Sequence, residues 1–363
     1  MKKHNIIAMA LTSLMALPVI AQDSTPAVGD ILQGINMFTP EEGDPAYKVK
    51  ANEKYGTQWG VDMAYGLWNT EKVSDVKRHN NLALLHAQLN QRLIEDKANG
   101  GTWLRVEFSG SWGLDRESAQ SDTFFTEAYA TASGLHADAM GPHEGIFPEV
   151  ALMQYFAGKR ACLIAGMVNL TNYFDAVSIA NDSFSSFTND GFVNSTILPL
   201  VDSNIGGILQ VELNRNNYMM VAVSRTGCDS GYNPFNSDGY AVVGEYGHIF
   251  ADGAATLRIN PFYTSTDVDM DDGTGERRRQ NAGLVASIEY TPCDPLTIYS
   301  RAGFAAKQYL SNSAEFSVGA NIKLFPSRED DFLGISYGVF KGQTPCDGER
   351  AEHNREQVLE VMY

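Results

Sequence analysis

The feature that most constrains the fold is a pair of long runs in which residues of opposite character alternate. From 102 to 112, even positions carry Leu, Val, Phe, Gly and Trp, and odd positions carry Trp, Arg, Glu and two Ser. The run 85–93 alternates similarly, and 97–101 joins the two with residues that favour turns. Strands of about ten residues exceed the usual ~5–6 and match the ~9–11 that cross a bilayer. We expect a hairpin with one face toward lipid and one toward water.

The charge and the amino terminus limit the class of protein. A formal charge of −17 argues against nucleic acid as a partner, because phosphate binding needs clustered Lys and Arg. Lys2 and Lys3 precede an apolar run, and small residues lead up to Ala21, so residues 1–21 are predicted to be a signal peptide. Residues 22–55 are predicted to form a periplasmic arm or a short helix with a linker. A soluble periplasmic protein is the alternative to a membrane location.

The strand pattern repeats through residues 56–363, which we interpret as one domain. Short turns alternate with long polar loops, an asymmetry typical of outer-membrane barrels. The sequence thus favours an all-β fold, a transmembrane antiparallel β-barrel of about 14–16 strands with short periplasmic turns and long external loops, over a soluble sandwich or propeller. Residues 124–131 are a further candidate strand. The predicted strands are 59–67, 85–93, 102–112, 148–156, 161–170, 207–214, 218–225, 240–250, 254–264, 281–291, 296–306, 316–325, 332–340 and 358–363.

Five segments resemble the carbohydrate-selective outer-membrane porins. They are RACLIAGMVNLTNYFD at 160–175, IAND at 179–182, FTNDGFVN at 187–194, IYSRAG at 298–303 and NREQVLEVMY at 354–363. The resemblance implies a passive sugar channel of roughly sixteen strands in the outer membrane, with small sugars and outer-membrane lipid as partners and a possible homo-oligomer. It also implies that strands closing the barrel follow the segment resembling 355–363, so we expect this chain to be truncated relative to a functional porin, or an adjacent reading frame to supply the end.

Strand parity predicts which side chains line the pore. Charges of both signs fall on the polar faces, together with aromatic rings that could stack on a sugar. Each charge could equally be an ordinary solvated lumen residue. The predicted pore-lining residues are Arg105, Glu107, Glu212, Arg258, Glu289, Arg301 and Lys323, and the stacking candidates are Trp103, Phe262 and Tyr299.

The long segment 171–204 is too apolar for a freely solvated loop. We expect it to fold into the pore and narrow it, or to pack at the barrel rim or on a neighbouring subunit. The constriction candidates are Tyr173, Phe174, Asp175, Asn181, Asp182 and Phe187.

The remaining motifs predict neither catalysis nor a cofactor. Residues 267–278 depart from a calcium-binding loop, because position 278 is Arg where Glu is required, and the seven histidines lack metal-ligand spacing. Among four cysteines, Cys228 and Cys346 in long loops form the candidate disulfide. The expected function is a diffusion channel for carbohydrates or similar small neutral solutes and not an enzyme. The alternatives are a structural or adhesive barrel with a plugged lumen and, more distantly, a barrel hydrolase.

Overall fold

The computed structural model describes part of the chain. The described residues are 45–69, 79–113, 144–181, 186–201, 203–226, 239–265, 268–269, 277–278, 281–306, 312–325, 331–343 and 353–363. The expected signal peptide, the candidate strand 124–131, Asp182, Cys228 and Cys346 lie outside them. Among these residues, no helix is both long and apolar enough to cross a membrane.

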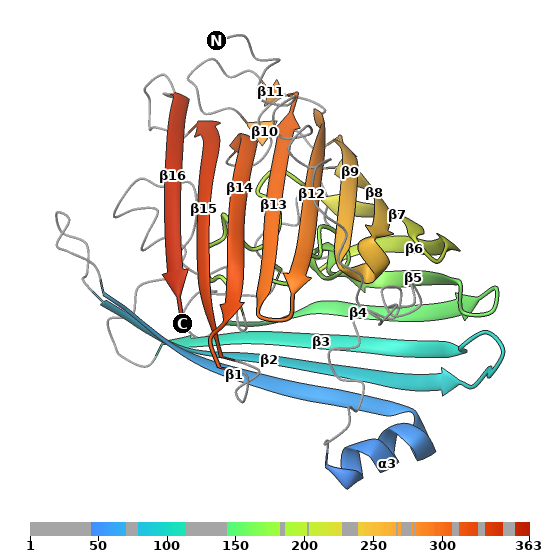
Figure 1. Ribbon diagram of the computed structural model, residues 1–363. Coiled ribbons are helices and arrows are strands. Elements are labelled where there is room, and N and C mark those ends of the chain that lie inside the picture. Colours follow the sequence, from blue (N-terminus) through green and yellow to red (C-terminus); the bar gives the residue numbers. More distant parts are fainter. Residues whose placement is uncertain are drawn as a thin grey trace.

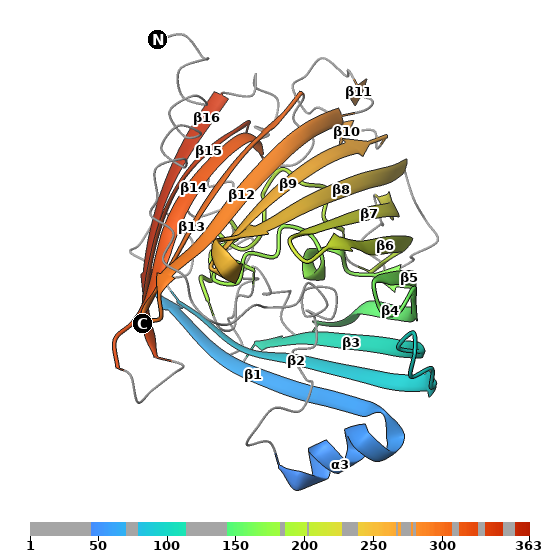
Figure 2. The same cartoon turned by 45° about the vertical axis from the view of Figure 1, so that its right-hand side comes forward.

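One antiparallel sheet of 14 strands makes up the fold, and each strand pairs with its neighbour along the chain apart from the small β10–β11 pair. Figures 1 and 2 show this sheet curving around a concave interior. The elements are α3 (Ala46–Tyr55), β1 (Thr57–Asn69), β2 (His79–Ile94), β3 (Thr102–Gly113), β4 (Glu144–Phe156), β5 (Ala161–Val168), η2 (Leu170–Asn172), β6 (Asn204–Asn214), β7 (Asn217–Thr226), β8 (Gly239–Phe250), η3 (Ala251–Gly253), β9 (Ala255–Thr264), β10 (Val268–Asp269), β11 (Arg277–Arg278), β12 (Asn281–Cys293), β13 (Leu296–Ala305), β14 (Asn312–Lys323), β15 (Phe332–Gln343) and β16 (His353–Met362).

The strand predictions are confirmed, since each of the 14 predicted strands overlaps one strand of the large sheet. Two differences have physical causes. β14 begins four residues before the predicted start at Phe316, and β16 begins five residues before Val358, because both continue pairing with β15 through polar sequence. The pair β10 and β11 lies within a segment predicted to be an irregular loop.

The outer face of the sheet is apolar, whereas the inner face carries polar and charged groups together with apolar residues that pack against other protein groups. Strand β7 shows the alternation, because Met219, Val221 and Val223 are exposed whereas Tyr218 and Met220 are buried on the other face. On β3, Arg105 and Glu107 are buried on the concave face. Exposed apolar side chains facing outward and buried charges facing inward suit a wall between lipid and a polar interior.

Local backbone features fix the short connections. Helix α3 ends at Gly56, whose φ of 63° is left-handed and favours glycine, and the chain then enters β1. Figure 1 shows α3 beside the start of β1. At the β4–β5 turn, Ala157, Gly158 and Lys159 all have positive φ, which reverses the chain within four residues.

Strands β1 and β16 are the two edges of the large sheet. β1 pairs with β2, β16 pairs with β15, and no hydrogen-bonded ladder joins β1 to β16 within the described ranges. The expectation that further strands follow the chain stays a prediction.

Candidate pore and its inner loop

Residues 169–203, between β5 and β6, form a segment that we call the inner loop. It begins with the short helix η2, and Figure 2 shows the loop on the concave side of the sheet. The Asn169 side chain starts the turn by accepting a hydrogen bond from the Thr171 amide at 3.2 Å. The loop therefore lies against the inner wall of the sheet.

Apolar side chains of the inner loop pack against two parts of that wall. Phe174 packs in a cluster with residues of β4–β9 and β12, including Ile164 and Phe262. Phe187 and Phe192 pack in a second cluster with Tyr299 of β13 and Phe340 of β15. This packing explains why a connecting segment contains so many aromatic residues, because each fully buried one removes a large apolar surface from water.

Six glutamates on the inner wall accept hydrogen bonds from the inner loop. On β3, Glu107 accepts from Asn172 Nδ2 at 2.6 Å, and on β16, Glu360 accepts from the Thr188 amide at 2.9 Å. The acceptors and their loop partners are Glu107 with Asn172, Glu149 with Tyr173, Glu245 with Asp175, Glu289 with Ser178, Glu315 with Ser195 and Thr196, and Glu360 with Thr188 and Asn189. The inner loop is thus attached to strands from β3 to β16.

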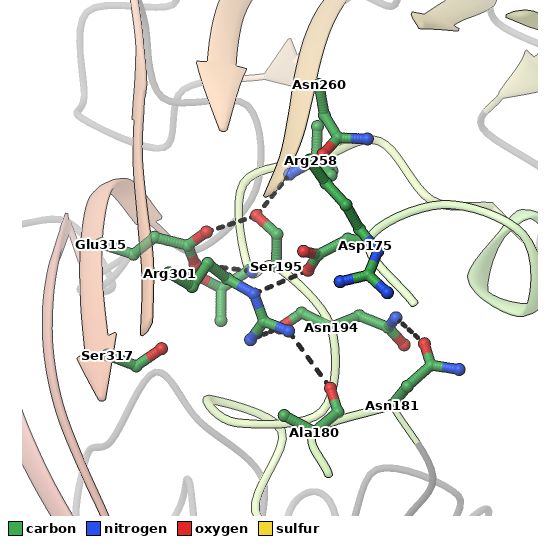
Figure 3. Close-up of polar contacts among 12 residues, drawn as sticks. Asp175, Ala180, Asn181, Asn194, Ser195, Arg258, Asn260, Arg301, Glu315 and Ser317 are labelled. Atoms are coloured by element: carbon green, nitrogen blue, oxygen red, sulfur yellow. Dashed lines mark hydrogen bonds and ion pairs between the residues drawn. The ribbon is translucent and has the colours of Figure 1, made fainter. Parts of the chain in front are cut away.

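The centre of the attachment is a buried ion pair between Arg301 of β13 and Asp175 of the inner loop. Arg301 Nε lies 2.6 Å from Asp175 Oδ2, and both side chains are fully buried. The guanidinium also donates to the carbonyl oxygen of Phe192 at 3.1 Å and, in Figure 3, to those of Ala180 at 3.1 Å and Asn194 at 2.7 Å. One side chain therefore ties together three separate stretches of the loop.

A second buried pair lies near the start of the loop. Arg105 Nε of β3 is 3.0 Å from Glu149 Oε2 of β4, and Tyr173 donates to the other Glu149 oxygen at 2.6 Å. Burial raises the pKa of the Tyr173 phenol well above its usual value of about 10, so it stays protonated and remains a donor. The Arg105 guanidinium also lies 5.7 Å from the centre of the Tyr173 ring.

A third group joins β7, β8, β9 and β12. Arg258 Nη1 lies 3.5 Å from Glu289 Oε2, and Figure 3 shows Arg258 and Asn260 beside the Arg301–Asp175 pair. Asn260 Nδ2 donates to Glu245 Oε2 at 2.7 Å, and Tyr218 donates to Glu245 Oε1 at 2.7 Å. These bonds hold the carboxylate that accepts from the Asp175 amide.

The structure brings five of the seven predicted pore-lining residues together beneath the inner loop. These are Arg105, Glu107, Arg258, Glu289 and Arg301. The other two lie apart: Glu212 is near the β6–β7 turn, and Lys323 is exposed at the end of β14, 3.7 Å from Asp294.

The predicted stacking residues occupy different environments. Phe262 is 5% exposed and Tyr299 is 1% exposed, with the Tyr299 hydroxyl 2.7 Å from Ser336 Oγ, so their ring faces are covered by protein. Trp103 is partly buried, and its indole donates to the Gly100 carbonyl. A stacking role for these rings stays a prediction.

The constriction candidates in the described ranges all belong to the attached part of the loop. Tyr173, Phe174, Asp175 and Phe187 are buried, and Asn181 accepts a hydrogen bond from Asn194. No group of three or more possible metal ligands occurs within the described residues.

Sequence reasoning missed several inner-wall residues that contact the loop or the pore. Glu149, Glu245 and Glu360 lie within predicted strands at polar positions, so the same parity argument could have found them. His86 and Asp62 on β2 and β1 form a smaller polar group, in which His86 lies 3.0 Å from Glu107.

The fold and the polarity of its outer face define a class: a transmembrane antiparallel β-barrel. A solved structure of OprB from Pseudomonas putida at high pH is similar over 82% of this chain and 78% of that chain, with a TM-score of 0.67 and 12% identity. OmpF of Salmonella typhi in complex with daunomycin covers 82% of this chain and 83% of that chain, with a TM-score of 0.47 and 10% identity. At 12% identity, the similarity to OprB establishes the fold.

Sequence comparison adds less than the structure. An uncharacterized protein of Aquifex aeolicus (strain VF5) is 30% identical over 121 residues, which are 31% of this chain and 39% of that protein. The match therefore spans well under half of that relative. No family model matches the chain.

Proposed function

We propose that this protein is an outer-membrane diffusion channel whose bore is narrowed by the inner loop. The observation that carries the proposal is the attachment of one loop to inner-wall glutamates on six strands, from β3 to β16. A segment held in this way occupies part of the interior and leaves the rest to solute. The outward apolar faces suit contact with outer-membrane lipid.

The chemistry of the inner wall favours small polar solutes, with carbohydrates as the leading class. Amide and carboxylate groups alternate with arginines there, as in Gln88, Asn90 and Arg105 on β2 and β3. A sugar sheds part of its hydration on entering a narrow bore, and such a mixture of donors and acceptors can replace the lost hydrogen bonds. The similarity to OprB in fold is compatible with this solute class.

A second candidate is a barrel with a plugged lumen and a structural or adhesive role. The specific observation that favours it is the extent of packing beneath the inner loop, where Phe174, Phe187 and Phe192 each have 0% exposure. If the remaining interior is filled as well, no solute passes.

We also propose that the channel assembles as a homo-oligomer, by analogy with its porin neighbours.

Reconstitution in planar lipid bilayers tests these alternatives. A porin produces stepwise ion current, and a sugar that enters its bore lowers that current as its concentration rises. The titration uses a hexose and a disaccharide, with a liposome-swelling measurement on the same preparation. A plugged barrel inserts without current or swelling, and that result would reject the proposed channel.

A further inference from the structure

The inner wall holds more negative than positive charge close to the inner loop. Three ion pairs join Arg105 to Glu149, Arg258 to Glu289 and Arg301 to Asp175. The other two inner-face cations lie at strand ends near short turns: Arg92, over the Trp103 ring, and Lys323, beside Asp294.

Other inner-face carboxylates have no such partner. Glu245, Glu315 and Glu360 accept hydrogen bonds from neutral groups and make no ion pair with Lys or Arg within the described residues. Asp62 has only His86 nearby, at 3.9 Å. Counted by residue type, the described inner wall and inner loop therefore carry more carboxylate side chains than Lys and Arg side chains.

Asp62 lies where this field would meet a passing ion. It is on the inner face of β1, and its side chain is 51% exposed. In the described ranges the inner loop bonds to glutamates on strands from β3 to β16, and Asp62 lies on β1, beyond that set of strands. A low-dielectric wall concentrates the field of such groups into the aqueous path.

We propose that the channel selects cations over anions, with Asp62 and Glu360 among the carboxylates that set the preference. This inference rests on the proposed channel function and extends it to the charge of the preferred solute. Neutral sugars remain compatible with it, whereas anionic solutes are disfavoured. Rings of acidic side chains produce the same preference in other cation channels.

The test is the reversal potential of the reconstituted protein across a KCl gradient centred near 0.1 M. We expect the unmodified channel to favour K⁺ over Cl⁻. A fixed unit charge changes the concentration of a monovalent ion about 10 Å away in water about twofold, upward for K⁺ and downward for Cl⁻ beside a carboxylate. Asp62→Asn should therefore lower the K⁺/Cl⁻ permeability ratio by roughly two- to fourfold. The preference should weaken near 1 M salt, where the screening length falls to about 3 Å.

Asp252→Asn is the matched control. Asp252 is exposed in a short turn with a φ of 53°, a conformation that Asn also tolerates, and the substitution removes the same charge away from the wall. Glu360→Gln is the second variant, because it keeps one carbonyl oxygen for Thr188 while removing a wall charge.

Each outcome decides a separate point. A silent protein rejects the proposed channel itself. A conducting protein that favours Cl⁻, or that is unselective at 0.1 M, overturns the inference and leaves the channel standing. A K⁺ preference that survives both Asp62→Asn and Glu360→Gln overturns the assignment to these carboxylates. A preference lowered by either variant but unchanged in Asp252→Asn supports it.

Discussion

Removing the Arg301 side chain is the most informative perturbation of the inner loop. Arg301→Ala takes away the partner of a fully buried Asp175 carboxylate and the donor to three loop carbonyls. Breaking a buried ion pair by removing one member costs about 3–5 kcal/mol, since the remaining charge is left uncompensated. Each 1.4 kcal/mol is tenfold, so the equilibrium between attached and released loop should shift by a factor of roughly 10² to 4 × 10³.

The expected result is a channel that assembles normally but conducts differently. Release of the loop from β13 should raise the single-channel conductance, increase current fluctuations and weaken sugar-dependent block, whereas the strand pairing of the sheet does not depend on this side chain. Planar bilayers give the conductance, and heat-dependent mobility on denaturing gels reports whether the barrel has folded. Arg215→Ala, in the exposed β6–β7 turn, is the matched control.

A double variant separates the charge effect from simple loss of packing. Asp175→Ala combined with Arg301→Ala removes both charges, so it should disturb the loop less than the sum of the two single changes. If Arg301→Ala folds and retains the conductance and sugar block of the unmodified protein, the ion pair does not hold the loop in the bore, and the reasoning is refuted.

The remaining predictions concern the outer face and the cysteines. Leu104→Arg places a charge on the outward face of β3 and should lower the free energy of unfolding by about 2–4 kcal/mol if the residue lies near the bilayer midplane. The measurement is the urea midpoint of unfolding of the barrel in lipid vesicles, and an unchanged midpoint would contradict the assignment of faces. A maleimide should label exposed Cys293 in the folded protein and buried Cys162 only after unfolding, as peptide mapping by mass spectrometry can check. The same mapping without reductant should find Cys228 linked to Cys346, and two free thiols at these positions would exclude the disulfide.

Strand positions could be predicted from the sequence because the alternation is local. Side chains alternate between the two faces of a strand. Arg105 and Glu107 are therefore buried on one face, whereas apolar residues are exposed on the other. The start of β14 could not be predicted so well, because Asn312 to Glu315 lack apolar alternation and are recruited by pairing with β15. Glu315 therefore fell just outside the predicted strand, although it binds the inner loop.

The inner loop illustrates the limit of a local argument. Its aromatic content predicted that the loop packs against other parts of the protein. The burial of Phe174, Phe187 and Phe192 confirms this prediction. Its partners could not be predicted, because they are distant in sequence. Thr188 bonds to Glu360, 172 residues away, and Asp175 pairs with Arg301, and the alternation of residues along a strand does not specify such contacts. The burial of Phe262 and Tyr299 could not be predicted for the same reason, because it depends on contacts with distant parts of the chain.

The attachment of one loop to both early and late strands also has a consequence for the order of assembly. The inner loop is synthesised before β13, β14 and β16, which supply Arg301, Glu315 and Glu360. Until those strands arrive, its buried carboxylate and its backbone donors lack their final partners. Contacts between residues so distant in sequence are slow to form. The narrow part of the interior is therefore complete only once β13, β14 and β16 have joined the sheet.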